Sequence, residues 1–513
     1  MTTLPLLTLM MVVPLVGAVV IALLPAASAA LAKPIALGAS LVTLVLALVA
    51  WAQWDASGPQ FQLTETHAWI PQFGVSYGLG VDGVALALIV MACVLAPICV
   101  LAAWNDLGDG AGEDPKRTKT YFALMLSLLP FMVGVFAATD VFLFYVFFEA
   151  MLIPVYFLIG LFGGPRRQYA AMKFILFSLA GGLIMLVGVI ALYFHGPGDS
   201  DGFLVQNLIG NVSGSVEAKR WIFLAFFVAF AIKAPMWPVH TWLPDASTEA
   251  RPATAVLLVG VLDKVGTYGM IRFCLSLFPE AAKWATPVII VLAVISVIYG
   301  ALLAIAQTDM MRLIAYTSIS HFGFIVLGIF ALTSTAGAGS SLYMVNHGFS
   351  TAGLFLLAGF LIARRGYKRI PDYGGWQRVT PVLAGTFLVA GLSSLALPGL
   401  SSFVSEFLVL AGTFQVNKPA AVIATVGIVL AALYILLMYQ RIFTGPKPAF
   451  AEGTAPLDLS WREKFVVIPI IASFLVLGFY PKPVLDLVNP AVKQTMEIVG
   501  ASDPAPTNAG SAK

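Results

Sequence analysis

The sequence predicts an all-α polytopic membrane protein, and its composition is the first observation behind that prediction. Of 513 residues, 60% are hydrophobic and only 10% are charged, and the mean hydropathy is +0.94. Soluble domains carry about 25% charged residues. This number of polar side chains is too small to cover the surface of so long a chain in water. The surplus apolar surface must therefore face lipid. The composition therefore excludes a soluble enzyme, a nucleic-acid-binding protein and a secreted disulfide scaffold.

A series of long apolar segments is the second observation, and it sets the number of membrane spans. A helix that crosses a bilayer needs about 20 mostly apolar residues. About fourteen segments meet this requirement. They are 4–24, 34–54, 83–104, 120–137, 140–162, 169–195, 220–240, 250–278, 285–305, 308–332, 341–364, 380–413, 419–441 and 463–487.

Prolines interrupt two of these segments. In the seventh, Pro235 and Pro238 follow Lys233, and in the twelfth Pro398 precedes Gly399. A proline removes a backbone hydrogen bond, and a broken span is tolerated only where it lines a buried or water-filled cavity. The two breaks lie five helices apart, so we expect helices 4–8 and 9–13 to be inverted repeats. The expected parts are 1–119 (helices 1–3), 120–278 (first repeat), 285–441 (second repeat), 463–490 (helix 14) and 491–513 (C-terminal tail).

The distribution of basic residues predicts how the chain crosses the membrane. Of 28 Lys and Arg residues, 18 fall in loops that follow odd-numbered segments and 8 on the opposite side. Lysine and arginine concentrate in cytoplasmic loops. Both termini are therefore expected on the non-cytoplasmic side. The loop 55–82, which contains acidic residues and no Lys or Arg, fits the outer side.

Ionisable residues in the middle of apolar segments are the third observation, and they are the strongest indication of function. A charge at the bilayer centre costs about 2.5–3.5 kcal/mol on insertion scales, so such a residue needs a partner, water or a function. The candidates are Glu149, Lys233, Lys264 and Glu406, in segments 5, 7, 8 and 12. Bonding to a neighbouring helix is the alternative interpretation. Function is favoured because Lys233 and Glu406 lie beside breaks and no Ser, Thr or Asn lies within a helical turn of Glu149.

Histidines and one further carboxylate extend this set. His321 and His347 lie in segments 10 and 11, and an imidazole can give and take a proton near neutral pH. The alternative for each is a buried histidine satisfied by a hydroxyl group. His240 is equally compatible with proton uptake and with packing, and Asp263 with a tuning charge and with a simple buried neighbour. From Glu149 to Glu406 these residues predict a relay of titratable groups along the middle of the membrane.

No motif for a nucleotide, a metal or a cluster is present in the sequence. It contains no Walker loop, no G-x-G-x-x-G that opens a helix after a strand and no H-E-x-x-H. Its cysteines, Cys93, Cys99 and Cys274, form no C-x-x-C pair. We therefore expect no cofactor and no metal on this chain, so that any redox cofactor would lie on another polypeptide.

Six stretches around these residues carry a resemblance to a known family. They read FEAMLIPVYFLIG, KAPMWPVHTWLPDA, LLVGVLDKVGTYGMIRF, IAYTSISHFGF, NHGFSTAGLFLLAG and LPGLSSFVSEF. Over essentially its whole length the chain resembles the antiporter-like family. That family comprises the large membrane subunits of proton-pumping NADH:quinone oxidoreductase (respiratory complex I) and the related Mrp-type sodium/proton antiporter subunits.

The resemblance implies a role for each candidate residue. Glu149 and Lys233 would form an ion pair, Lys264 would be the central relay lysine, and Glu406 would be the terminal group that faces the next subunit. His321 and His347 would connect the last two. Glutamate rather than lysine at the position of Glu406 is typical of one subunit type in the family. The chain departs from the family pattern at Ser247, Arg251 and Asp263, where His, Pro and an apolar residue are usual.

The resemblance also implies partners and a location. The chain would be a proton-translocating subunit of an oxidoreductase in the bacterial inner membrane, flanked by L-like and N-like antiporter subunits. FMN, iron–sulfur clusters, NADH and quinone would be bound by other subunits. Its own partners would be lipid, protons and neighbouring subunits, with no nucleic acid. Two alternatives stay open, namely an Mrp-type sodium/proton antiporter subunit and the membrane subunit of a hydrogenase-type complex.

Overall fold

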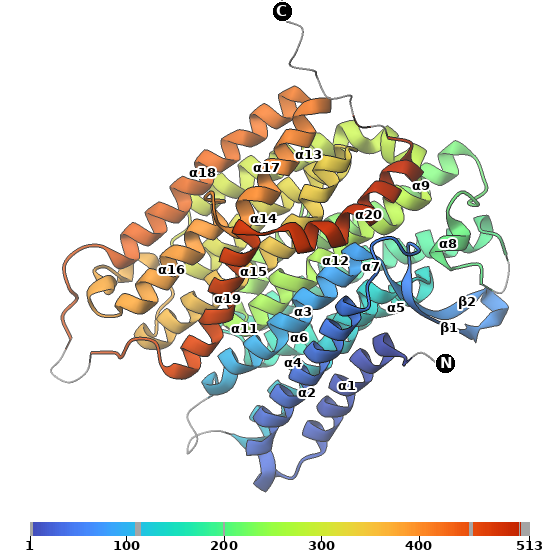
Figure 1. Ribbon diagram of the computed structural model, residues 1–513. Coiled ribbons are helices and arrows are strands. Elements are labelled where there is room, and N and C mark those ends of the chain that lie inside the picture. The colour runs from blue at the N-terminus through green and yellow to red at the C-terminus, as the bar shows by residue number, and fades with distance from the viewer. Residues whose placement is uncertain (1–3, 108–113, 199–200, 451–454, 502, 504–513) are drawn as a thin grey trace, which may run out of the picture.

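The computed structural model describes residues 4–107, 114–198, 201–450, 455–501 and 503. It is a bundle of helices with one small hairpin at its edge (Figure 1). The helices of the first half are α1 (Leu6–Leu23), α2 (Ala32–Ala52), α3 (Gly83–Ala102), α4 (Pro115–Ala137), α5 (Val141–Ala150), α6 (Leu152–Phe162), α7 (Arg167–His195), α8 (Val205–Leu208), α9 (Val216–Lys233), α10 (Trp242–Glu249), α11 (Pro252–Ala255) and α12 (Lys264–Gly269). The π-helical segments η5 (Val256–Leu262) and η6 (Met270–Leu275) flank α12. The second half contains α13 (Pro279–Ile305), α14 (Met310–Phe330), α15 (Ser334–Arg365), α16 (Pro381–Ser394), α17 (Ser401–Val416), α18 (Lys418–Phe443), α19 (Trp461–Phe479) and α20 (Lys482–Val499).

The number of spans in the structure differs from the predicted fourteen. Among the described residues, 11 helices are long and apolar enough to cross a membrane, or 12 if a bent pair is one span. The all-α polytopic class is confirmed, but the count of fourteen is not. With 12 spans, the difference lies at the seventh and twelfth segments, where breaks leave α9, α16 and α17 too short or too charged to count as spans on their own. The count of 11 also leaves out the fourteenth segment. The prolines that predicted the breaks thus also explain the lower count.

The C-terminal region departs most from the prediction. The expected span 463–487 is two helices, α19 and α20, which meet at Pro481 with a bend of 66°. A C-terminal tail was predicted over 491–513, but residues 491–499 are helical. Residues 502 and 504–513 lie outside the described part of the chain. The prediction missed α20 because this helix is amphipathic rather than apolar throughout. It packs across α3 and α15 with its apolar face (Figure 1).

The loop 55–82 folds into a hairpin that the sequence did not predict. Strands β1 (Gln62–Ile70) and β2 (Val75–Val81) pair antiparallel, with Glu65 opposite Leu79 and His67 opposite Tyr77. The carboxylate of Glu65 accepts the backbone N–H of Leu7 at 2.8 Å, which ties the hairpin to α1.

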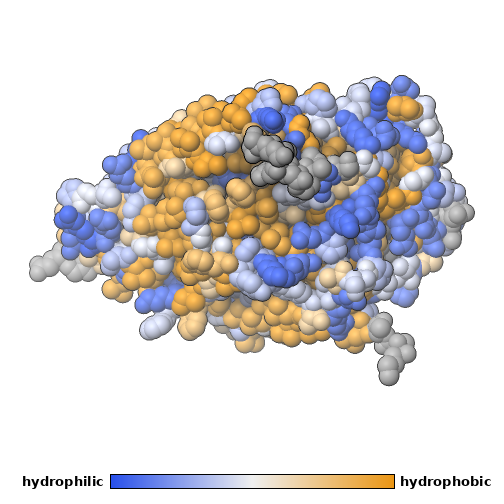
Figure 2. Space-filling view, turned by 45° about the horizontal axis from the view of Figure 1, so that its top comes forward, coloured by the Kyte–Doolittle hydropathy of each residue, from blue (hydrophilic) through white to orange (hydrophobic). Residues whose placement is uncertain are grey.

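The core and the periphery of the bundle differ sharply in exposure. Large apolar side chains are exposed on α1, α2, α7, α13, α18 and α19. Figure 2 shows hydrophobic residues over much of one face, as expected of helices that face lipid. By contrast, the most apolar stretches of α14 and of the run Pro252–Leu275 are 94% and 100% buried. The predicted ionisable residues lie mainly among these buried helices.

Candidate functional site

The six principal candidate residues come from six different elements of the bundle. They are Glu149 (α5), Lys233 (α9), Lys264 (α12), His321 (α14), His347 (α15) and Glu406 (α17). Glu149 is half-buried, and the exposed fractions of the other five are 4% or less. Buried ionisable groups in such number are costly unless they pair or function.

Glu149 is the penultimate residue of α5, next to an interruption of its helix that the sequence analysis did not identify. α5 ends at Ala150 and α6 begins at Leu152. Pro154 has no N–H to donate to the carbonyl of Ala150, four residues earlier, which accounts for the break. The carboxylate lies against Gly182 of α7, where an added Cβ would meet Oε1 at 1.6 Å. A side chain at position 182 would therefore displace it.

Lys233 is the last residue of α9, and the chain stays non-helical until Trp242. The freed backbone groups find partners inside the protein. The indole N–H of Trp242 donates to the carbonyl of Ile232 at 2.9 Å, and the N–H of Trp237 donates to Ser296 Oγ at 2.9 Å. A broken span in a membrane requires this internal satisfaction. The predicted break in helix 7 is therefore confirmed, and Lys233 lies at its edge.

Lys264 lies in a helix with π-helical segments on both sides. Such segments are rare and often occur at functional sites. The Lys264 ammonium donates to the carbonyl of Val259 at 2.6 Å and lies 2.7 Å from His347 Nδ1. The His347 ring is 5.2 Å from the ring of His321, between centroids. The structure therefore brings these three predicted residues into one buried cluster.

Glu406 lies on α17, beyond the break of helix 12. Between α16 and α17, Ala396 and Gly399 have φ values of 61° and 90°, in the left-handed region. Glycine adopts this conformation without strain. The hydroxyls of Ser393 and Ser401 lie 2.9 Å apart across the break. The predicted break is thus present, and serine hydroxyls lie on both sides of it.

One tyrosine contacts Glu406 and another contacts His321, and the sequence analysis missed both. The hydroxyl of Tyr343 donates to Glu406 Oε2 at 3.1 Å, and the hydroxyl of Tyr434 lies 3.3 Å from His321 Nε2. Both side chains are buried. In the sequence, each tyrosine places one hydroxyl group in the middle of an apolar segment. This signal is weaker than that of a charged residue, because burial of a neutral phenol costs less free energy.

Glu149 and Lys233 make no direct ion pair in this structure. Within the described residues no ion pair of 4 Å or less joins them, and neither Lys233 Nζ nor Glu149 Oε1 has a hydrogen-bond partner. The ammonium instead lies 5.4 Å from the ring centroid of Phe148 and 5.6 Å from that of Phe174. The direct ion pair that the resemblance implied between these two described residues is therefore not formed in this structure.

The two secondary candidates are also buried. His240 lies in the break of helix 7, its ring 5.1 Å from that of Tyr299, and its Nδ1 has no partner among the described residues. Asp263 immediately precedes α12, is fully buried, and has no hydrogen-bond partner for either oxygen within the described structure.

An ionic cluster near α10 was not foreseen from the sequence. Asp245 of α10 accepts bonds at 2.6 Å from Lys173 of α7 and from Arg312 of α14. It therefore joins elements of the first and second halves of the chain. Arg251, noted for its departure from the family, donates from Nε to the carbonyl of Phe162 at 2.8 Å. The signal for Asp245 was weak because charges near helix ends are common.

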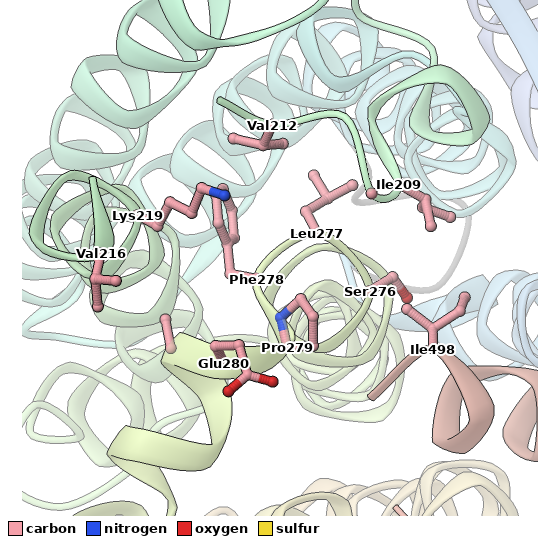
Figure 3. Close-up of a pocket in the computed structure, with 12 residues that line it drawn as sticks. Ile209, Val212, Val216, Lys219, Ser276, Leu277, Phe278, Pro279, Glu280 and Ile498 are labelled. Carbon is pink, nitrogen blue, oxygen red and sulfur yellow. The ribbon is translucent and has the colours of Figure 1, made fainter. Parts of the chain in front are cut away.

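A cavity of about 370 Å³ lies apart from these groups. Figure 3 shows its lining by apolar side chains such as Ile209, Val212 and Phe278, with Lys219 and Glu280 also present. None of the predicted site residues lines it. In the described part of the chain, no group of three or more His, Cys, Asp or Glu residues is placed to hold a metal ion.

The fold and the buried row of ionisable groups on interrupted helices define a class, polytopic membrane proteins with titratable groups in the membrane interior. Comparisons with known proteins narrow this class. A family model described as NADH:quinone oxidoreductase/Mrp antiporter, transmembrane, matches residues 138–431. The chain is 50% identical to NADH-quinone oxidoreductase subunit M of Mycobacterium tuberculosis (strain CDC 1551 / Oshkosh), over 99% of this chain and 97% of that relative. The chain therefore belongs to the NADH:quinone oxidoreductase/Mrp antiporter family.

Solved structures agree with this assignment. A chain of respiratory complex I from Thermus thermophilus with bound NADH matches with a TM-score of 0.87 and 30% identity, over 96% of this chain and 100% of that one. A chain of the Mrp complex from Dietzia sp. DQ12-45-1b matches with a TM-score of 0.83, over 97% of this chain and 100% of that chain. At 23% identity, this similarity shows the fold alone. The predicted family is confirmed.

Proposed function

We propose that this chain is the M-type, antiporter-like subunit of a proton-pumping NADH:quinone oxidoreductase. The observation that carries the proposal is the buried contact of Lys264 with His347, within a row of ionisable groups that extends from Glu149 to Glu406. The full-length identity to a subunit M supports the choice of complex. In this role the chain moves protons, while NADH oxidation and quinone reduction take place on other subunits.

The first half of the row acts through charge coupling. Two unit charges about 6 Å apart interact by roughly 3 kcal/mol at an effective dielectric constant of about 20. Motion of the Glu149 carboxylate relative to Lys233 therefore changes how tightly the lysine holds its proton. The break beside each residue gives the backbone freedom for such motion. A proton released from Lys233 then passes towards Lys264.

The second half of the row conducts the proton onward. His347 contacts Lys264 and stacks edge-on against His321, so the imidazoles can accept a proton from the lysine. The hydroxyls of Tyr434 and Tyr343 contact His321 and Glu406, respectively. A hydroxyl can both donate and accept a hydrogen bond, so it can connect the imidazole to the carboxylate. Glu406 is then the last group of the row on this chain.

The neighbouring subunits, the membrane and the location of the cofactors follow from the same proposal. We propose L-like and N-like antiporter subunits on either side of this chain, in a bacterial inner membrane with both termini on the non-cytoplasmic side. FMN, iron–sulfur clusters and the NADH and quinone sites belong to other subunits. Residues 120–278 and 285–441 form two inverted repeats, supported by the equivalent breaks after Lys233 and before Glu406.

The decisive test is Lys233→Ala in the assembled complex. The variant should assemble and oxidise NADH but lose coupled proton translocation in vesicles, because the coupled charge has gone. Lys283→Ala is the matched control, since Lys283 is an exposed lysine beside Glu280. Full pumping by Lys233→Ala would contradict the proposed relay.

Purification in mild detergent separates the proposal from its alternatives. Recovery of a large assembly with inhibitor-sensitive NADH:quinone reductase activity supports the proposal. A small flavin-free assembly that exchanges sodium for protons in liposomes would assign the same residues to an Mrp-type antiporter. Hydrogen-dependent activity would assign them to a hydrogenase-type complex.

A further inference from the structure

Asp263 is a fully buried carboxylate that the row described above does not use. Its exposed fraction is 0%, and neither of its oxygens has a hydrogen-bond partner among the described residues. An isolated buried carboxylate is strongly destabilising unless another charge compensates it. The position lies at the junction between the π-helical segment η5 and α12, immediately before Lys264.

The helix that carries Asp263 packs directly on the end of α9. At Gly266, an added Cβ would meet the carbonyl oxygen of Phe230 at 2.5 Å and the nitrogen of Ala234 at 2.6 Å. Residues three apart share a helix face, so Asp263 is on the face that meets this end of α9. Ala234 directly follows Lys233, which places the lysine and the carboxylate at the same helix contact.

The charge of Asp263 interacts with both lysines of the row. Asp263 directly precedes Lys264, and it lies on the helix face that meets the end of α9, where Lys233 is located. Other groups act from the flanking elements, Glu149 on Lys233 from α5 and His347 on Lys264 from α15. Asp263 is thus the carboxylate common to the two lysines.

We propose that Asp263 is the shared counter-ion of Lys233 and Lys264, so that one of the two lysines is charged at a time. This inference rests on the proposed function. One buried carboxylate compensates one ammonium, and a second ammonium beside it would remain uncompensated. When the Lys233 ammonium releases one proton, it becomes a neutral amine. The neutral amine of Lys264 takes up one proton and becomes an ammonium, while Asp263 stays ionised and the local net charge is unchanged.

The test compares Asp263→Asn with Asp263→Glu in the complete complex. Asparagine keeps the shape and removes the charge, whereas glutamate keeps the charge. Protons moved per NADH oxidised should fall by about tenfold or more in Asp263→Asn, the size expected for loss of a buried charge interaction. Asp263→Glu should keep most of the activity. Glu280→Gln, which removes an exposed carboxylate outside the row, should pump normally.

Two pumping results would overturn the inference. Normal pumping by Asp263→Asn would show that the charge is not needed. Equal loss in Asp263→Asn and Asp263→Glu would show that only the shape matters. If Lys233→Ala stops pumping while Asp263→Asn pumps normally, the proposed function stands and only the shared counter-ion is wrong.

A double variant keeps the inference testable if Asp263→Asn assembles poorly. Removal of the counter-ion leaves the charged lysine of the pair without it, so loss of one lysine should restore thermal stability. The double variant Asp263→Asn with Lys264→Met should therefore melt at a higher temperature than Asp263→Asn alone. A double variant no more stable than the single variant would overturn the inference.

Discussion

The contact between Glu149 and Gly182 shows how single residues position a buried charge. Only Ala150 separates Glu149 from the break at Met151, and the Glu149 carboxylate occupies the space that any side chain at position 182 would need. Glycine therefore fixes where the carboxylate can rest. Since the interaction of two charges falls with distance, this position sets the coupling of Glu149 to Lys233.

Gly182→Ala should uncouple proton movement without removing any ionisable group. The new methyl group would push the Glu149 carboxylate aside, because the Cβ would lie 1.6 Å from Oε1. We expect a several-fold loss of protons moved per NADH oxidised, with assembly retained, measured in vesicles. Gly385→Ala is the control, since an added Cβ there meets nothing within 4 Å. Equal pumping by both variants would contradict the role given to this contact.

At the scale of elements, the hairpin and α5 are joined by one buried carboxylate. Asp140 caps α5 by accepting the N–H of Leu143 at 2.9 Å, and it also accepts the N–H of Ser76 from β2 at 2.8 Å. Burial raises the pKa of Asp140 from 3.8 to about 6, against the opposing effect of these hydrogen bonds. The start of the helix that carries Glu149 thus depends on a titratable group.

The stability of this junction should vary with pH in a defined direction. Because the folded state holds the Asp140 proton more tightly than the unfolded chain, its contribution to the free energy of unfolding is greatest below pH 3.8 and is lost as the pH rises through about 6. In Asp140→Asn this loss should be absent. Melting temperatures of both proteins in detergent across this range would check it, with the exposed Asp55→Asn as control. Parallel curves for wild type and Asp140→Asn would contradict it.

Elements also show what the sequence could and could not predict. The breaks beside Lys233 and Glu406 were predictable because proline acts locally. The break at Met151 has the same cause, but an uninterrupted apolar stretch concealed it. The amphipathic α20 was missed because a search for apolar spans does not detect a helix that is polar on one side.

The candidate site also has residues that the sequence could predict and residues that it could not. Buried charges were predictable because their cost in a membrane is large whatever their neighbours. The tyrosines that contact His321 and Glu406 depend on which helices meet, and sequence spacing does not contain that information. The same holds for the contact of Gly266 with α9, which brings Asp263 to Lys233.

For the whole molecule, charge asymmetry predicts an orientation that labelling can measure. The 18 to 8 division of basic residues predicts that both termini lie outside the cytoplasm. The native cysteines, Cys93, Cys99 and Cys274, are all fully buried, so a cysteine-specific reagent should find little background. Introduced cysteines at exposed loop positions can therefore report the two sides of the membrane.

Ser57→Cys and Gln377→Cys form the matched pair for this measurement. Both positions are exposed, the first in the acidic loop before the hairpin and the second in the basic loop between α15 and α16. On intact cells, a membrane-impermeant maleimide should label Ser57→Cys and leave Gln377→Cys unlabelled. Inside-out vesicles should give the reverse. Labelling of Gln377→Cys on intact cells would contradict the predicted orientation.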